Sequence, residues 1–194
     1  PHFALNGISF WEEFGPSALT AKIRAEGMYN FGPSLSPNNA FYILQGIETL
    51  SLRMKKHIEN TKMMLEFLKE NEAVSWLRHP DLEDHPDHKI AKKILPLGSG
   101  SIIVFGIKGG RDAGKAFIEN VKLSSHLANV GDAKTLLIHP GSTTHSHLSS
   151  EAMKMSGLTD DMIRLSVGLE DIEDIKIDFE KGFKAAAKIS SKRS

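Results

Sequence analysis

The chain has 194 residues, of which 40% are hydrophobic and none is cysteine. That is enough for one buried core, or for a domain core with a docking surface. Lys and Arg together number 24, as do Asp and Glu, so no net field favours a nucleic acid or an anionic membrane as partner. The absence of cysteine excludes disulfides and thiolate chemistry and suits a reducing compartment, so we expect a cytoplasmic protein.

No apolar run approaches the roughly 20 residues needed to span a bilayer, and the first residues lack the charged and apolar regions of a signal peptide. The sequence begins at Pro1 rather than Met, which is expected of a chain that has been processed or belongs to a longer polypeptide. Residues 1–34 mix aromatic residues and glycines with one helix-like stretch at 17–27, ended by glycine. We interpret 1–34 as the remnant of another domain.

A long helix is the firmest structural prediction. Ser36 and Pro37 supply an N-cap and a first-turn proline, and the apolar residues that follow recur at helical spacing. We predict a helix over about 37–70. Because this length exceeds that of ordinary helices, residues 35–70 are expected either to connect two domains as one helix or to form two helices with a kink.

The remaining elements are short. We expect strands at 74–77, 101–107, 135–138 and 162–167, and helices at 86–95, 111–122, 149–155 and from 172 onward. This order predicts an α+β domain over 71–194, with a small, mostly antiparallel sheet covered by helices.

Arg164 is the first candidate for ligand binding. It lies in a predicted strand whose alternation separates two faces, Ile163, Leu165 and Val167 on one and Met162, Arg164 and Ser166 on the other. A guanidinium among apolar residues needs an anion, and its planar donors match a carboxylate. The alternatives are an ion pair with an acid such as Glu170 or Asp171, or an exposed position on an edge strand.

Two further polar groups lie near predicted strand ends. Asn129 precedes Val-Gly-Asp132 and could donate to the same carboxylate, although an asparagine there is more often a turn residue that binds its own backbone. The run 142–145, Ser-Thr-Thr-His, follows a Pro-Gly turn and could orient a ligand. A Ser-His hydrolase is disfavoured, because a nucleophile needs a base placed in space and a third group behind it.

Metal and phosphate sites are not expected. His79, His85 and His88 lie in a loop rich in proline and acids that could bind adventitious metal, but no ligand set with a recognised spacing is present. A solvated surface loop is the preferred interpretation. The glycines near 98–100 and 109–110 match neither phosphate-binding motif and are typical of turns.

Three ordered segments stand out: Leu35 to Met54 with His57, Asn129 to His145, and Arg164 to Asp171. Together they resemble the pyridoxal-phosphate-dependent Cys/Met metabolism enzymes, and the resemblance runs from about residue 15 to 179. The second segment is similar to the O-acetylhomoserine sulfhydrylase branch in particular, because Asn129-Val-Gly-Asp132 stands where lyases and synthases tend to have a serine followed by Leu-Gly-Gly.

The resemblance implies the C-terminal portion of a fold-type I transferase that uses pyridoxal 5'-phosphate, with residues 1–34 as the remnant of its cofactor-binding domain. By position, Arg164 would hold the substrate's α-carboxylate and Asn129 would assist. Thr144 and His145 would line or support that site. The complete enzyme would make homocysteine, or methionine, from O-acetylhomoserine and sulfide or a thiol, as a homo-oligomer, commonly a tetramer.

The cofactor lysine of this family lies upstream of the long helix in a Ser-x-Thr-Lys-like setting, and no lysine here has that context. The resemblance therefore implies an N-terminal chain of the same enzyme as partner, and a chain inactive by itself. Two alternatives stay open: a cystathionine γ-synthase or lyase of the same family, and a non-catalytic amino-acid-binding module. The sequence does not distinguish the preferred thiol, or O-acetylhomoserine from O-acetylserine.

Overall fold

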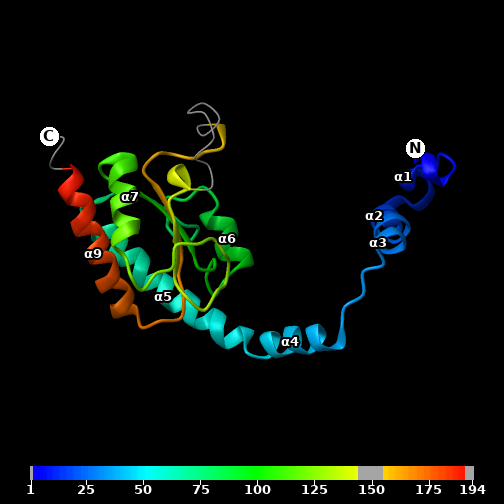
Figure 1. Ribbon diagram of the computed structural model, residues 1–194, viewed down its shortest axis with the longest axis horizontal. Helices are drawn as coiled ribbons and strands as arrows, with labels where there is room; N and C mark the ends of the chain where they lie inside the picture. The colour runs from blue at the N-terminus through cyan, green and yellow to red at the C-terminus, as the bar shows by residue number, and fades with distance from the viewer. Residues whose placement is uncertain (1, 144–154, 191–194) are drawn as a thin grey trace. The chain divides into compact units, whose positions relative to one another are not determined.

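The computed structural model describes residues 2–143 and 155–190, which fall into two compact units, Pro1–Glu48 and Thr49–Ser194. Each unit is described by itself. The first is entirely helical, and the second contains a sheet with helices packed on it (Figure 1). Among the described residues, no helix is long and apolar enough to cross a membrane.

The first unit is a series of short helices without a core. They are η1 (Phe3–Leu5), α1 (Phe10–Phe14), η2 (Gly15–Ser17), α2 (Ala18–Lys22), the π-helical η3 (Ile23–Met28), α3 (Tyr29–Phe31) and α4 (Pro37–Glu48). None of its described residues is buried, and Trp11 and Phe31 are 70% and 86% exposed. Local helix-favouring sequence therefore accounts for the helices of this unit, because the unit buries no hydrophobic residues of its own among those described.

The helix predicted over 17–27 extends further than expected. Gly27 does not end it, because the chain passes through the π-helical turn of η3 into α3. The helix ends at Gly32, whose φ of 54° is the left-handed conformation that glycine adopts without steric cost. A glycine alone therefore did not locate the helix end.

The long predicted helix is two helices, as the kinked alternative anticipated. The Ser36 hydroxyl accepts from the Asn39 N–H at 3.2 Å, which confirms the predicted N-cap of α4. The helix is interrupted at Thr49, and α5 runs over Leu50–Glu70. The Thr49 side chain accepts a hydrogen bond from the Arg53 guanidinium. Thr49 makes no side-chain hydrogen bond to the helix backbone, and as a β-branched residue it has a lower helix propensity than most of its neighbours.

The sheet of the second unit is antiparallel throughout, which confirms the predicted α+β class. Its strands are β1 (Val74–Arg78), β2 (Ile102–Ile107), β3 (Leu136–Ile138) and β4 (Met162–Ser166), in the order β1-β2-β4-β3. Arg164 of β4 is opposite Val104 of β2 and Ile138 of β3. Strand β4 is thus an interior strand, paired on both sides.

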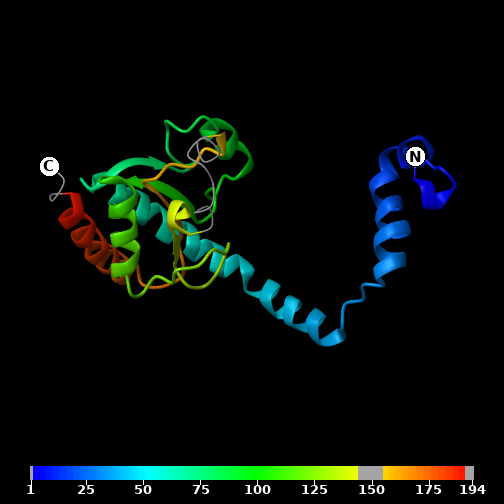
Figure 2. The ribbon, with the colours of Figure 1, turned by 45° about the horizontal axis from the view of Figure 1, so that its top comes forward.

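Three helices cover one face of this sheet. Helices α7 (Gly110–Asn120) and α9 (Ile172–Ser190) lie side by side against it together with α5 (Figures 1 and 2). The short helices α6 (His88–Ile94) and η4 (Pro140–Ser142) complete the unit, whereas the helix predicted at 149–155 falls almost entirely outside the described residues.

The core lies between the sheet and these helices. Its centre is an aromatic cluster in which the rings of Phe117 and Phe183 are 4.8 Å apart and those of Phe117 and Phe179 are 5.3 Å apart. Phe105 of β2 contacts the same rings. Such rings bury a large apolar area and stabilise each other at their edges. The opposite face of the sheet carries Arg164.

Candidate functional site

Arg164 projects from the sheet face that the core does not use. Its neighbours Ile163 and Leu165 are fully buried in the core, while Arg164 is half-buried, so the predicted alternation is confirmed. Its Nη2 donates to the Asn129 carbonyl oxygen at 3.2 Å. Within residues 2–143 and 155–190 it makes no ion pair, and its place on an interior strand excludes the edge alternative.

A guanidinium has five N–H donors in a planar fork, and among the described residues this one uses a single donor, on a backbone oxygen. A half-buried cation that forms no ion pair with the described acids favours an external anion, and two parallel hydrogen bonds to a carboxylate are its best match. With respect to the described residues, Arg164 therefore retains the donors that such a ligand needs.

Asn129 lies beside Arg164, although the contact differs from the expected one. Its side chain is exposed; its Oδ1 accepts from the Val130 N–H at 2.9 Å, and its Nδ2 donates to Asp132 Oδ2 at 3.2 Å. The hydrogen bond from the Lys134 N–H, followed by that from Asn129, holds the pKa of Asp132 below its usual range. The amide thus shapes its own loop, and the carbonyl of the same residue contacts Arg164.

Hydrogen bonds hold the turn after β3, residues 139–143, in place. His139 is fully buried, and its Nε2 donates to the Asp160 carbonyl at 2.8 Å; burial lowers the pKa of this imidazole. Thr143 Oγ1 donates to the His139 carbonyl at 2.9 Å, and Arg111 donates to the Gly141 carbonyl at 2.6 Å. The next predicted site residues, Thr144 and His145, lie outside the described residues, so their roles stay predictions.

Buried polar residues of α5 hold the chain that follows β4. His57 Nδ1 donates to the Val167 carbonyl at 2.7 Å, and Asn60 Nδ2 donates to the carbonyls of Gly168 and Glu170 at 3.0 and 2.9 Å. Both side chains are almost fully buried. The sequence analysis missed these two residues, although a signal for them exists. His57 and Asn60 share one face of the helix with the apolar residues Met64 and Leu68, and polar residues in an apolar stripe are expected to make buried hydrogen bonds.

Glu170 binds Thr135 rather than Arg164. Its two carboxylate oxygens accept from the Thr135 N–H at 2.6 Å and from the Thr135 hydroxyl at 2.8 Å. The Gly168 N–H in turn donates to the Thr135 hydroxyl oxygen at 2.9 Å. The acid considered as an internal partner of Arg164 is thus committed elsewhere.

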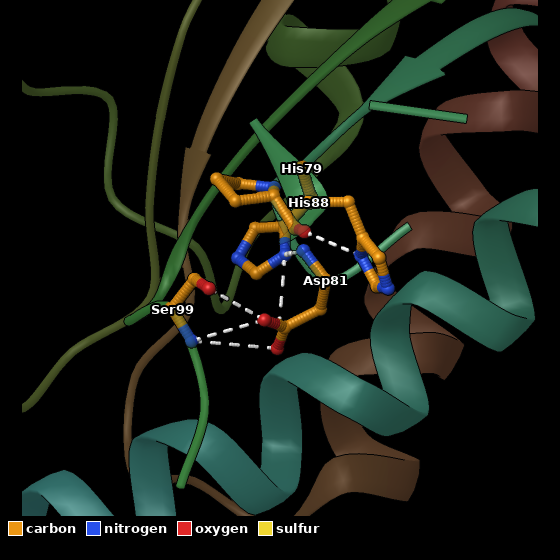
Figure 3. A network of polar contacts seen from close by, with 5 residues as sticks. His79, Asp81, His88 and Ser99 are labelled. Atoms are coloured by element: carbon orange, nitrogen blue, oxygen red, sulfur yellow. Dashed lines mark hydrogen bonds and ion pairs between the residues drawn. The ribbon is translucent and has the colours of Figure 1, made fainter. Parts of the chain in front are cut away.

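A separate polar cluster lies in the loop that follows β1 (Figure 3). The Asp81 carboxylate accepts from the Ser99 hydroxyl at 2.6 Å and from the Ser99 N–H, and His88 Nδ1 donates to the Pro80 carbonyl at 2.9 Å. His79 Nδ1 accepts from the Asp81 N–H at 3.1 Å, and burial lowers the pKa of His79. The Asp81–Ser99 bonds hold the loop after β1 against the loop before β2. The described residues contain no group of three or more His, Cys, Asp or Glu that could hold a metal.

The fold and the site define an α+β domain with a half-buried arginine on the sheet face opposite the core. Comparison with known proteins gives its family: the sequence profile of the Cys/Met metabolism PLP-dependent enzymes matches residues 14–184. The O-acetyl-L-homoserine sulfhydrylase 1 of Thermus thermophilus is 45% identical over 93% of this chain and 43% of its own length. The homocysteine synthase of Schizosaccharomyces pombe is 42% identical over 96% of this chain and 43% of its own length.

Solved structures agree with the sequence comparisons. A putative O-acetylhomoserine (thiol)-lyase from Campylobacter jejuni has a TM-score of 0.77 and 32% identity, covering 85% of this chain and 39% of that one. A cystathionine gamma synthase from Xanthomonas oryzae pv. oryzae has a TM-score of 0.73 and 32% identity, covering 82% and 41%. The chain belongs to the Cys/Met metabolism family of PLP-dependent enzymes, and it spans less than half the length of these relatives.

The described lysines do not have the setting of a cofactor-binding lysine. The Campylobacter structure contains a pyridoxyl-lysine residue. In residues 2–143 and 155–190 of this chain every lysine is exposed, except Lys56 and Lys176, which are half-buried. A lysine that forms a Schiff base is usually activated by burial or by a neighbouring cation. No described lysine has that setting.

Proposed function

We propose that this chain forms the C-terminal, substrate-carboxylate-binding part of an O-acetylhomoserine sulfhydrylase. The complete enzyme would make homocysteine, or methionine, from O-acetylhomoserine and sulfide or a thiol. One observation carries the proposal: Arg164, half-buried and without an acidic partner among the described residues, lies against the Asn129 loop. The family and the named relatives supply the reaction class.

In this proposal Arg164 binds the α-carboxylate of the amino-acid substrate through two parallel hydrogen bonds. The Asn129 loop fixes the orientation of the guanidinium, and Thr144 and His145 line the same site. A carboxylate held in one place sets the orientation of the reacting bonds and raises the rate without any chemistry by these residues. Bound pyridoxal phosphate would supply the electron sink that the reaction needs.

The lysine and the phosphate-binding residues would come from an N-terminal portion of the same enzyme, outside these 194 residues. The exposed apolar residues of the first unit are consistent with a large contact surface for this N-terminal portion. The unit's apolar side chains are exposed, and a hollow of about 630 Å³ between α1, α2 and α3 is lined by residues such as Leu5, Phe14 and Tyr29. Large exposed apolar surfaces of this kind are typical of interfaces. We further propose a cytoplasmic homo-oligomer, most simply a tetramer, without a nucleic-acid partner.

A second candidate is a cystathionine γ-synthase or lyase of the same family, which the similarity to the Xanthomonas synthase favours. These enzymes also act on amino acids, so Arg164 would have the same role in them. Product analysis separates the candidates: sulfide as acceptor would yield homocysteine, whereas cysteine as acceptor would yield cystathionine. A non-catalytic amino-acid-binding module would bind a substrate and yield neither product.

The test of the carboxylate role is Arg164→Lys in the complete, cofactor-loaded enzyme. Lysine keeps the charge but loses the planar fork, so we expect the KM for O-acetylhomoserine to rise about 10- to 100-fold, the equivalent of a lost charge-assisted bond. Arg78→Lys is the matched control, because Arg78 is an exposed arginine on edge strand β1. An unchanged KM in Arg164→Lys, or equal changes in both variants, would overturn the role.

The assembly is tested by native mass spectrometry of the purified material. A complex that contains a lysine-bearing N-terminal portion and the mass of pyridoxal phosphate would support the proposed enzyme. This chain alone and without cofactor would favour a binding module.

A further inference from the structure

We infer that Glu170 is a positioning residue for substrate binding: its carboxylate holds the loop that sets Asn129 against Arg164. The inference rests on the proposed role of Arg164. It concerns a residue that does not touch the ligand and acts through the loop that contacts the guanidinium.

The first step is the attachment of the loop to Glu170. The loop 129–135 begins at Asn129, whose carbonyl accepts a hydrogen bond from Arg164. It ends at Thr135, whose N–H and hydroxyl both donate to the Glu170 carboxylate. Thr135 is fully buried. A carboxylate that receives two hydrogen bonds from one buried residue fixes that residue in position and direction, because charge-assisted bonds are short and directional. One end of the loop is therefore immobilised.

The second step is that the residues just before Glu170 also hold the C-terminal end of this loop, at 133–135. The Leu169 N–H donates to the Ala133 carbonyl at 2.9 Å, and the Gly168 N–H donates to the Thr135 hydroxyl. The backbones approach so closely that a Cβ on Gly168 would lie 2.4 Å from the Thr135 nitrogen. The loop is thus tied to 168–170, the chain segment that follows β4 directly.

The third step is that α5 fixes this segment. Asn60 donates to its carbonyls at Gly168 and Glu170, and His57 donates to the carbonyl of Val167, the residue just before it. Arg164 lies on the strand that leads into the segment, and Asn129 lies on the loop tied to it. Arg164 and the Asn129 loop are therefore both positioned by the segment 168–170. Glu170 is the residue of this segment whose side chain binds the loop.

Loss of the Glu170 carboxylate would leave the N–H and the hydroxyl of buried Thr135 without their acceptor, which favours a rearranged loop. The Asn129 carbonyl would then no longer orient the guanidinium. The cost would fall on binding of the amino-acid substrate, because the carboxylate is held throughout the reaction. Sulfide has no carboxylate, so its binding would be unaffected.

The experiment compares Glu170→Ala, Glu170→Gln and Glu173→Gln in the complete, cofactor-loaded enzyme. We expect Glu170→Ala to raise the KM for O-acetylhomoserine about 10-fold, the usual cost of one charge-assisted hydrogen bond, with kcat and the KM for sulfide within about twofold. Glu170→Gln keeps an acceptor for the Thr135 N–H but not for the hydroxyl, so a rise of about threefold is expected. Glu173 pairs with Lys176 on the surface, and its variant should match the wild type.

A double-mutant cycle distinguishes positioning from a general loss of stability. If Glu170 acts through Arg164, the KM of the Arg164→Lys, Glu170→Ala double variant should equal that of Arg164→Lys alone, because the residues form one unit. Multiplying effects, or an unchanged KM in a folded Glu170 variant, would overturn the inference. Should Glu170→Ala fail to fold, Glu170→Gln carries the same comparison. An Arg164→Lys variant without effect would instead overturn the proposed function.

Discussion

The two units of this chain show how differently one polypeptide can use hydrophobic residues. In Thr49–Ser194 a core of large apolar side chains from the sheet and from the helices packed on it is buried, as with Phe105 and Phe179 at 0% exposure. In Pro1–Glu48 comparable side chains, such as Trp11 and Tyr29, stand 70% and 86% exposed. The second unit has the burial that stabilises a fold, and the first has only helix signals and caps. Sequence hydrophobicity alone does not distinguish the two.

This difference explains why the site is built where it is. Arg164 and the Asn129 loop are attached to the unit that has a core, so their geometry can be fixed by packing and by buried hydrogen bonds. The apolar surface of the first unit suits contact with other protein, as proposed above. Substitutions at matched positions in the two units test this division.

The largest contrast is expected for aromatic truncation. Phe117→Ala removes a fully buried ring from the aromatic cluster and should lower the free energy of unfolding by about 3–5 kcal/mol. Trp11→Ala removes an exposed ring and should change it by less than about 0.5 kcal/mol. Urea unfolding of the 194-residue chain measures both, and similar losses would contradict the proposed division between the units.

Glycine-to-alanine substitutions should lower the stability of the second unit and raise that of a helix in the first. A Cβ on Gly182 of α9 would lie 2.7 Å from the Phe117 ring, so Gly182→Ala should destabilise the second unit by about 1–3 kcal/mol through overpacking. A Cβ on Gly46 of α4 would meet nothing within 4 Å, so Gly46→Ala should stabilise that helix by about 0.5–1 kcal/mol. Circular dichroism during thermal unfolding reports both, and a loss of stability in Gly46→Ala would indicate packing that this structure lacks.

A pH dependence is expected in the second unit. Burial lowers the pKa of both His79 and His139 below 6.5, so the folded chain binds these protons more weakly than the unfolded chain. The contribution of these groups to stability is therefore fully present above about pH 6.5 and is lost as the pH falls below it, by up to about 1.4 kcal/mol per pH unit for each histidine.

Unfolding free energies measured from about pH 7.5 down to pH 5 should follow this slope, and His79→Gln should reduce it. Stability that rises on acidification through this range would contradict the direction of both pKa shifts.

The smallest effect is expected where the two units are alike. Lys22 of the first unit and Lys184 of the second are exposed, and each forms an i,i+4 pair with a glutamate at an N···O distance of 3.9 Å. Lys22→Gln and Lys184→Gln should each change the stability by less than about 0.5 kcal/mol, because exposed ion pairs are weak. A large effect in only one unit would show that charge, and not burial, separates them.

The sequence predicted those elements whose signals are local. The alternation around Arg164 placed β4 and its two faces correctly, and the Ser36 cap marked the start of α4. The interruption at Thr49 was anticipated only as an alternative, because a threonine within a helical pattern does not by itself say whether its hydroxyl will bind a neighbouring turn.

The site was predictable to a lesser extent. Arg164 and Asn129 were brought together as expected, but the contact is made by the Asn129 backbone, which the residue type does not specify. Glu170 was considered as a partner of Arg164, and the structure pairs it with Thr135. Which donor an acid meets depends on the packing of segments far apart in the sequence, here residues 35 positions apart.

The central claim, that Arg164 binds the substrate's carboxylate, is tested most directly by a crystal structure of the complete enzyme with a bound amino acid that lacks a leaving group. The account predicts two parallel hydrogen bonds from the Arg164 guanidinium to the α-carboxylate, with the Asn129 carbonyl still bound to the same side chain. A carboxylate bound elsewhere, or an Arg164 paired with an acid of the protein, would contradict it.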